Sequence, residues 1–382
     1  MTLAVPTSGL QLRSLVKASG ELELSLVRAE IPPLAPDQVL IRVEAAPVNP
    51  SDVRVLVGTA DLATLRKEGT GEALVTRAEI PPASRALMAG RLDRSLTAGN
   101  EGAGVVVAAG TADEARALLG KTVAVFSGAM YAQYCVVRVA SCLVLPDGTA
   151  PRDGASCFVN PLTALCMVET MRLEGHTALV HAAAASNLGQ MLCRICQADG
   201  VELVNIVRSA EQEALLRSLG AVHVCNSSTP DFMDRLTDVI AATKATLAFD
   251  PIGGGELAGQ ILGCMEAVLN RDWDGPFRRY GSPVQKQVYI YGGLDPRPTL
   301  IDRSFGMAWG IGGWLLWPAL SKVGPTREQE LRNRVARELK TTFASHFTSE
   351  IALADLLQPD ILKACKRSAT GQKILINPHK SE

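Results

Sequence analysis

The sequence predicts an α/β fold in two parts: a β-rich part over about the first 150 residues, then a doubly wound parallel sheet. Short apolar runs separated by glycine and proline fill the first part, which is typical of strands joined by turns. From about Ala155, helix-length segments alternate with apolar strands, and this alternation implies parallel strands with crossover helices.

Particular strands follow from the apolar runs. Those expected in the first part are Val39–Glu44, Gly104–Ala108, Thr122–Phe126 and Cys135–Val139. Two later strands are expected at Thr246–Phe249 and Val288–Tyr291, and a last one at Lys373–Ile376. Leu62–Leu96 interrupts the β pattern with charges, two prolines and helix formers, so we expect an inserted excursion there.

The stretch that ends at Arg208 is the most informative. Ala178–Val180 is apolar enough for a buried strand, and Ala182–Gly189 is a cluster of small residues that leads into a helix-length segment. A second apolar run, Val201–Val207, follows that helix. This is the layout of a strand–turn–helix–strand unit that binds a dinucleotide, with the pyrophosphate on the helix N-terminus.

The glycine pattern of this turn is incomplete. At the spacing of the three fingerprint glycines stand Ala183, Ser186 and Gly189, so an ordinary strand–helix crossover is the alternative interpretation. Arg208 favours the nucleotide site, because a cation at the end of the second strand pairs with the 2′-phosphate of NADP, whereas NAD is bound by an acid there. The sequence therefore predicts NADPH as the cofactor.

Composition limits the classes of partner. The chain has 382 residues, a formal net charge of −1, 47% hydrophobic and 20% charged residues, so we expect neither nucleic acid nor acidic lipid as a partner. Nine scattered cysteines fit reduced thiols, and the N-terminus shows no secretory signal, so we expect a cytoplasmic protein. Phe305–Leu320 is uncharged but short for a bilayer span, and a pocket wall or subunit interface is the better interpretation.

Five motifs occur in a characteristic order and spacing. They are AAPVNPSDVRVLVG (Ala45–Gly58), GNEGAGVVVAAG (Gly99–Gly110), VNPLTA (Val159–Ala164), LGAVHV (Leu219–Val224) and YGG (Tyr291–Gly293). Together they resemble the medium-chain dehydrogenase/reductase superfamily, especially the zinc-free quinone oxidoreductases and the mitochondrial-type 2-enoyl thioester reductases. The resemblance covers nearly the whole chain outside the inserted segment.

The resemblance implies a GroES-like β domain at residues 1–155 and 335–382 and a Rossmann domain at residues 156–334. It also implies an active site in the cleft between them, where NADPH passes a hydride to a small electrophilic substrate. Similar proteins are usually homodimers joined through the strand that corresponds to Val288–Tyr291.

Residue types argue against zinc. Zinc-dependent relatives have a cysteine in the segment matching Ala46–Asp52 and a His-Glu pair where this chain has Asn100–Glu101. Here the first segment holds no cysteine and Asn100 replaces the histidine, so neither soft nor imidazole ligands are present. We expect no metal.

Asn49 and Asp52 match positions that line the nicotinamide side of the cleft in similar enzymes. Helix capping after Pro50 is the other interpretation, and it weighs about equally for Asp52. By the resemblance and the turn, the predicted cofactor-binding residues are Asn160, Thr163, Ala183, Ser186, Asn187, Leu188, Gly189, Arg208, Ser209, Tyr291, Gly292, Gly293 and Trp314. A helix cap is the alternative for the first two, and a core or dimer contact for the tryptophan.

The thioester reductases carry a tyrosine just after the glycine matching Gly58, and it is their proposed proton donor. This chain has Thr59–Asp61 there and no tyrosine before Tyr131. Solvent, Tyr131 or a group of the inserted segment remain candidate donors. The leading hypothesis is a reductase of quinones or α,β-unsaturated carbonyls. Alternatives are an enoyl-thioester reductase with another proton donor, and a non-catalytic NADPH-binding protein.

Overall fold

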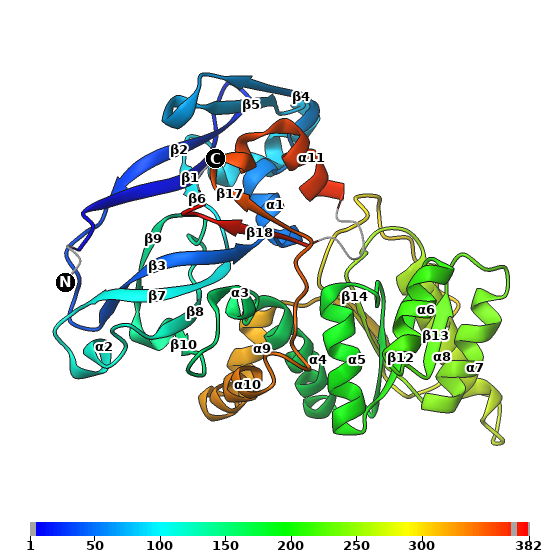
Figure 1. Ribbon diagram of the computed structural model, residues 1–382. Coiled ribbons are helices and arrows are strands. Elements are labelled where there is room, and N and C mark those ends of the chain that lie inside the picture. Colours follow the sequence, from blue (N-terminus) through cyan, green and yellow to red (C-terminus); the bar gives the residue numbers. More distant parts are fainter. Residues whose placement is uncertain (1–4, 368–372, 381–382) are drawn as a thin grey trace. The chain divides into compact units, whose positions relative to one another are not determined.

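The structure is a computed structural model that describes residues 5–367 and 373–380. It divides into two compact units, Met1–Val159 with Arg334–Glu382 and Asn160–Asn333, whose helices and strands are labelled in Figure 1. Each unit has its own apolar core. Residues 1–4, 368–372 and 381–382 of the expected first domain lie outside the described residues.

Two sheets form the first unit. Their strand orders are β4-β5-β2-β1-β6 and β10-β8-β7-β3-β18-β17, and β9 also pairs with β3. The strands are β1 (Ser8–Val16), β2 (Glu21–Glu30), β3 (Gln38–Pro47), β4 (Asp61–Glu68), β5 (Val75–Glu79), β6 (Ser95–Thr97), β7 (Glu101–Ala109), β8 (Thr122–Phe126), β9 (Tyr134–Arg138), β10 (Cys142–Val144), β17 (Ser349–Ala352) and β18 (Ile374–Asn377). Because β18 pairs with β3, the C-terminal segment completes the N-terminal unit.

Short helices connect these strands. The α-helices are α1 (Pro50–Val57), α2 (Asp113–Arg116), α3 (Pro151–Gly154) and α11 (Pro359–Arg367), and the 3₁₀ helices are η1 (Gly71–Ala73), η2 (Pro82–Arg91), η3 (Val139–Ser141) and η4 (Ala354–Leu357).

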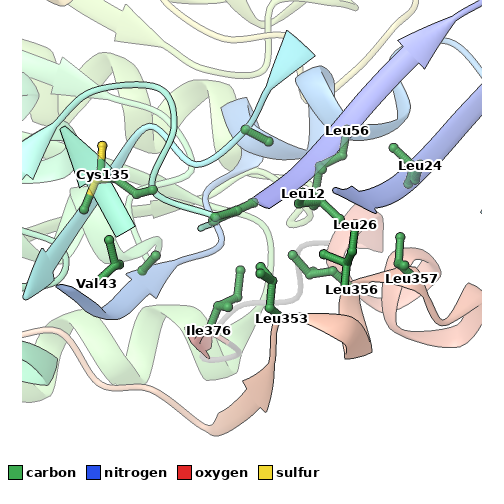
Figure 2. Packing of buried hydrophobic residues seen from close by; sticks show 14 of the residues in the cluster. Leu12, Leu24, Leu26, Val43, Leu56, Cys135, Leu353, Leu356, Leu357 and Ile376 are labelled. Atoms are coloured by element: carbon green, nitrogen blue, oxygen red, sulfur yellow. The ribbon is translucent and has the colours of Figure 1, made fainter. Parts of the chain in front are cut away.

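Alternation along β2 creates the core of this unit. Leu22, Leu24 and Leu26 point to the buried face, since successive side chains of a strand alternate between faces. Figure 2 shows Leu356 and Leu357 of the C-terminal segment close to this face. These leucines are buried in one cluster, so the C-terminal segment packs against the N-terminal strand β2.

We had expected Leu62–Leu96 to form an excursion from the β-rich part, but the segment contributes strands to one of its sheets. It supplies most of β4, all of β5 and most of β6, and these strands belong to the sheet that also contains β1 and β2. Its charges lie on the polar face of that sheet, where the Arg77 guanidinium contacts a Glu21 carboxylate oxygen at 2.6 Å. The helix formers there produce only the 3₁₀ turns η1 and η2.

The second unit is a parallel sheet with the order β13-β12-β11-β14-β15-β16. Its strands are β11 (Ala178–His181), β12 (Glu202–Val207), β13 (His223–Asn226), β14 (Leu247–Asp250), β15 (Lys286–Ile290) and β16 (Trp309–Gly313). Its helices are α4 (Val159–Leu173), α5 (Asn187–Asp199), α6 (Ala210–Ser218), α7 (Phe232–Thr243), α8 (Leu257–Arg271), α9 (Leu316–Val323) and α10 (Pro325–Arg337), of which α4 and α10 extend past the boundary of the unit. The predicted α/β fold class is confirmed.

The strand order reverses between β11 and β14. In an open α/β sheet, ligands bind outside the carboxyl ends of the strands at such a reversal. The turn that follows β11 is therefore the expected position of a ligand site in this sheet.

The strand expected to join two subunits is in the interior of the sheet. β15 pairs with β14 on one side and β16 on the other, so its backbone has no free edge for a second copy. A second copy therefore cannot extend the sheet by backbone pairing with β15, and the homodimer stays a prediction. The apolar segment Phe305–Leu320 contains β16 and the start of α9. Across the described residues, every helix is too short or too polar to cross a lipid bilayer.

A buried ion pair anchors β15 to α8. The Lys286 ammonium lies 2.7 Å from a Glu266 carboxylate oxygen, with side-chain exposures of 0% and 4%. The other Glu266 oxygen accepts the backbone N–H of Ser282 at 2.8 Å. The pair therefore fixes the connection that enters β15.

We predict that Lys286→Met lowers the free energy of unfolding by about 3–5 kcal/mol, because it leaves the Glu266 charge buried without a partner. Urea denaturation measures this change. The double substitution with Glu266→Met should recover most of the loss, whereas Arg217→Ala, which breaks an exposed helix pair, should cost about 0.5 kcal/mol or less. Equal losses for the buried and exposed pairs would contradict this interpretation.

Candidate active site

The turn between β11 and α5 is held in a defined shape. Ala183 has a φ of +48°, which a residue with a Cβ rarely adopts. The Ala184 backbone N–H donates to the carbonyl of Ile206 at 3.1 Å, which attaches the turn to β12. Ser186 is the N-cap of α5, and its Oγ accepts the Gly189 N–H at 3.1 Å.

Only one of the three fingerprint positions requires glycine for space. A Cβ on Gly189 would lie 2.2 Å from the carbonyl oxygen of Ala184, so a side chain there would push α5 away from the turn. Ala183 instead tolerates the left-handed conformation at a cost, and Ser186 serves as a cap. The incomplete glycine pattern thus still forms a tight turn that presents a helix N-terminus.

Arg208 and Ser209 follow β12. Since β11 and β12 pair in parallel, the end of β12 lies beside the turn. The Arg208 side chain is exposed, and its backbone N–H donates to Gln212 Oε1 at 3.0 Å. Ser209 is the N-cap of α6. An exposed guanidinium therefore stands next to a second helix N-terminus, a combination suited to a phosphate.

Aromatic side chains gather beyond the ends of β11 and β15. His181 Nε2 and the Tyr291 hydroxyl are 2.7 Å apart, and Trp314 lies edge-on to the Tyr291 ring. Trp314 Nε1 donates to Thr170 Oγ1 at 3.2 Å. Burial lowers the pKa of His181 to about 3 and raises that of Tyr291, so both rings are neutral at physiological pH.

The remaining predicted cofactor residues lie in this unit too. Asn160 and Thr163 are in the first turns of α4, the former half-buried and the latter buried. The first two residues of α5, Asn187 and Leu188, are half-buried and buried respectively. Gly292 and Gly293 follow β15, where a Cβ on Gly292 would lie 2.5 Å from the Pro251 carbonyl oxygen.

In the first unit, Asn49 and Asp52 belong to a buried polar cluster around Glu101. Asn49 is the N-cap of α1, its N–H donates to Asp52 Oδ2 at 3.0 Å, and its Nδ2 donates to Glu101 Oε1 at 2.8 Å. Asp52 Oδ1 accepts the Asn100 N–H at 2.8 Å. Burial raises the pKa of Asp52 to about 7, despite these two backbone donors. Both carboxylate oxygens of Asp52 thus accept backbone N–H groups, and these contacts agree with the interpretation of Asp52 as part of a helix cap.

Lys373 adds a cation to this cluster. The residue is 9% exposed, and its Nζ donates to Ser156 Oγ at 2.6 Å. Burial lowers the pKa of Lys373 to about 8, while the negative charge of Glu101 opposes that change. Glu101 Oε2 accepts the backbone N–H groups of Phe158 and Val159, each at 2.9 Å.

Tyr131 is in the core. Its exposure is 0%, its hydroxyl donates to the Pro47 carbonyl at 3.0 Å, and burial raises its pKa. A phenolate left there after proton transfer would have to form inside the core. This placement argues against the predicted role of Tyr131 as a proton donor.

The described residues contain no group of three His, Cys, Asp or Glu side chains placed to hold a metal ion. At the position where zinc-dependent relatives have histidine, Asn100 Nδ2 donates to Ser51 Oγ at 2.8 Å. The donor set around Glu101 therefore does not fit a catalytic zinc.

Two family models match the chain. Residues 35–147 match the alcohol dehydrogenase GroES-like domain, and residues 188–267 match the zinc-binding dehydrogenase model. A protein from Mesorhizobium loti assigned as an NADPH:quinone reductase has a similar structure, with a TM-score of 0.72 at 27% identity, covering 98% of this chain and 100% of the other. Quinone oxidoreductase from Escherichia coli, solved with NADPH, gives 0.67 at 16% identity, with coverage of 97% and 100%.

Curated relatives match a smaller share of the chain. The rat synaptic vesicle membrane protein VAT-1 homolog is 27% identical over 236 residues, 60% of this chain and 50% of that protein. Mitochondrial enoyl-[acyl-carrier-protein] reductase of Xenopus tropicalis is 26% identical over 305 residues, 75% of this chain and 74% of its own length. The chain spans about half the length of the first of these relatives.

Fold and motifs together define a two-unit protein of the dehydrogenase type, with a GroES-like unit and a nucleotide-binding sheet. The chain belongs to the medium-chain dehydrogenase/reductase superfamily, in its quinone oxidoreductase-like branch.

Sequence reasoning missed three members of the buried cluster: Glu101, Ser156 and Lys373. Glu101 was visible in the GNEGAG motif, where an acid inside an otherwise apolar strand is unusual. Nothing local marks Lys373, which precedes an ordinary apolar strand more than 200 residues later in the chain.

We predict opposite outcomes for two substitutions in the turn. Gly189→Ala should destabilise the protein by about 2 kcal/mol or more, because its Cβ meets the Ala184 carbonyl. Ala183→Gly should be neutral or stabilising by about 0.5–1 kcal/mol, because it relieves a positive φ. Urea denaturation of both variants tests this, and a Gly189→Ala protein as stable as the wild type would refute the tight turn.

Proposed function

We propose that the chain is an NADPH-dependent reductase that works without zinc and transfers a hydride to a quinone or to the activated C=C bond of an α,β-unsaturated carbonyl compound. The observation that carries this proposal is the tight turn between β11 and α5 with the exposed Arg208 beside it. The relatives and similar structures named above support the same class of reaction.

The residues of the second unit fit the dinucleotide. Gly189 lets α5 pack close against the Ala184 backbone, and the first N–H groups of α5 are suited to the charge of a pyrophosphate. Arg208 and Ser209 would hold the 2′-phosphate. Asn160, Thr163, Tyr291 and Trp314 would surround the nicotinamide end, which supplies the hydride when the cofactor is bound.

Neutral aromatic groups support the nicotinamide end. Because the His181–Tyr291 hydrogen bond joins two neutral rings, it keeps its form from about pH 5 to pH 9. This pair would therefore keep the Tyr291 backbone in place without adding charge near the reacting carbon.

Charge that develops on the substrate oxygen would be stabilised by hydrogen bonds rather than by a metal. Asn49 carries an amide donor, but its Nδ2 is already bonded to Glu101 and the residue is 3% exposed. Backbone N–H groups and water are the better donors, and water also supplies the proton, since Tyr131 is buried.

Enoyl-thioester reduction is the second candidate. The relative from Xenopus tropicalis favours it, because the match covers about three quarters of both chains. The absence of a tyrosine after Gly58 weighs against it, and a thioester substrate would need another donor.

We expect NADPH oxidation, followed at 340 nm, with at least one of a benzoquinone, a naphthoquinone or a small enone, and slower turnover of crotonyl-CoA. Crotonyl-CoA as the best substrate would instead select the thioester reductase. Saturable NADPH binding without turnover of any of the four would contradict catalysis and favour a binding protein.

Arg208→Ala should weaken NADPH binding by about tenfold or more and leave NADH binding within about twofold, because the lost charge pairs only with the 2′-phosphate. Isothermal titration calorimetry with both nucleotides measures this. Arg217→Ala is the matched control, since Arg217 is an arginine of the same unit that pairs with Glu213. If Arg208→Ala weakens both nucleotides equally, Arg208 does not select NADPH.

A further inference from the structure

The buried cluster of the first unit consists of Asn49, Asp52, Glu101, Ser156 and Lys373, and three of these side chains are ionisable. Asp52 and Glu101 have an exposure of 0%, and Lys373 of 9%. Removing such charges from water is costly, and an apolar core of the same volume is often at least as stable. The cluster therefore calls for an explanation other than stability.

Glu101, the first residue of β7, caps the N-terminus of α4. Phe158 and Val159 stand at the start of α4, where backbone N–H groups have no acceptor within the helix. Glu101 Oε2 accepts both N–H groups at 2.9 Å, and its negative charge suits a helix N-terminus. Its other oxygen accepts Asn49 Nδ2, so three donors converge on one carboxylate.

Lys373 holds the residues just before that helix. Its Nζ donates to Ser156 Oγ, two residues before Phe158. The charged and titratable groups that face it are Glu101 of β7, Asp52 of α1 and Cys157 of the same segment. The Phe347 ring also lies near, with its centroid 5.4 Å from Nζ.

We propose that Glu101 and Lys373 are positioning residues that fix Ser156–Val159 and, through the continuous helix, the backbone that carries Asn160 and Thr163. This inference rests on the proposed function, in which Asn160 and Thr163 bind the nicotinamide end of NADPH. Glu101, through the Phe158 and Val159 N–H groups, and Lys373, through Ser156, hold the start of α4 in the form that binds the cofactor. Neither residue touches substrate or cofactor.

The proposal has a pH signature. With its pKa lowered to about 8, Lys373 loses its proton as the pH rises through that value, which weakens its charge-assisted hydrogen bond to Ser156 and leaves Glu101 without the opposing charge. NADPH binding and kcat/KM should therefore fall above about pH 8. Glu101 raises the pKa of Lys373, so removal of its charge should move this decline to lower pH.

The experiment measures the NADPH Kd and kcat/KM of the full chain from pH 6 to pH 10. In Lys373→Arg the decline should disappear from this range, because arginine stays protonated. In Glu101→Gln it should begin about one pH unit or more below that of the wild type. Lys286→Arg is the matched control, since it makes the same change at a buried lysine of the other unit. Its profile should match the wild type.

A wild-type decline that persists unchanged in both Lys373→Arg and Glu101→Gln would overturn the proposal, as would an equal change in Lys286→Arg. Ser156→Ala is a milder variant if Glu101→Gln does not fold, and it should weaken NADPH binding about threefold or more at pH 7. NADPH binding without turnover would defeat the proposed reductase function alone, because the pH dependence of Kd still decides the role of Glu101 and Lys373.

Discussion

The contact between α5 and the turn that precedes it constrains the whole nucleotide-binding unit. Gly189 packs so close to the Ala184 carbonyl that no side chain fits between them. That contact sets the direction in which α5 leaves β11, and with it the place where the helix N-terminus meets the carboxyl edge of the sheet. The strand order reverses at the same point, so the sheet and the turn both direct a ligand there.

The first unit is stabilised differently. Its sheets take strands from both ends of the chain, and leucines of the C-terminal segment complete the core around β2 (Figure 2). Within that apolar surrounding, the charges of Asp52, Glu101 and Lys373 stand out, because each would be costly alone. Their hydrogen bonds reach α1, β7 and the start of α4, so the cluster connects these elements by polar contacts.

Sequence patterns predicted the second unit well because its signals are local. The apolar run Ala178–Val180, the small residues after it and the helix that follows lie in one short stretch, and β11 and α5 form there. In the first unit, Val39–Glu44 lies within the observed β3. The strands in Leu62–Leu96 were missed, because the charges that form ion pairs on the sheet face hide the apolar alternation of a strand.

The candidate site residues also divide into those that local sequence signals identify and those that only the folded chain brings together. The proposed roles of Gly189 and Arg208 follow from their places in a motif, whereas Glu101 and Lys373, far apart in the sequence, come together around Ser156–Val159 only in the folded chain. Tyr131 shows the reverse case: a residue chosen for its chemistry is fully buried, and sequence gave no sign of that burial.

A crystal structure of the full chain grown with NADP⁺ would test the central claim most directly. The account predicts the pyrophosphate on the backbone N–H groups at the start of α5, next to Gly189, and the 2′-phosphate within hydrogen-bond distance of the Arg208 guanidinium. A nucleotide bound elsewhere on the chain, or one whose 2′-phosphate points away from Arg208, would contradict it.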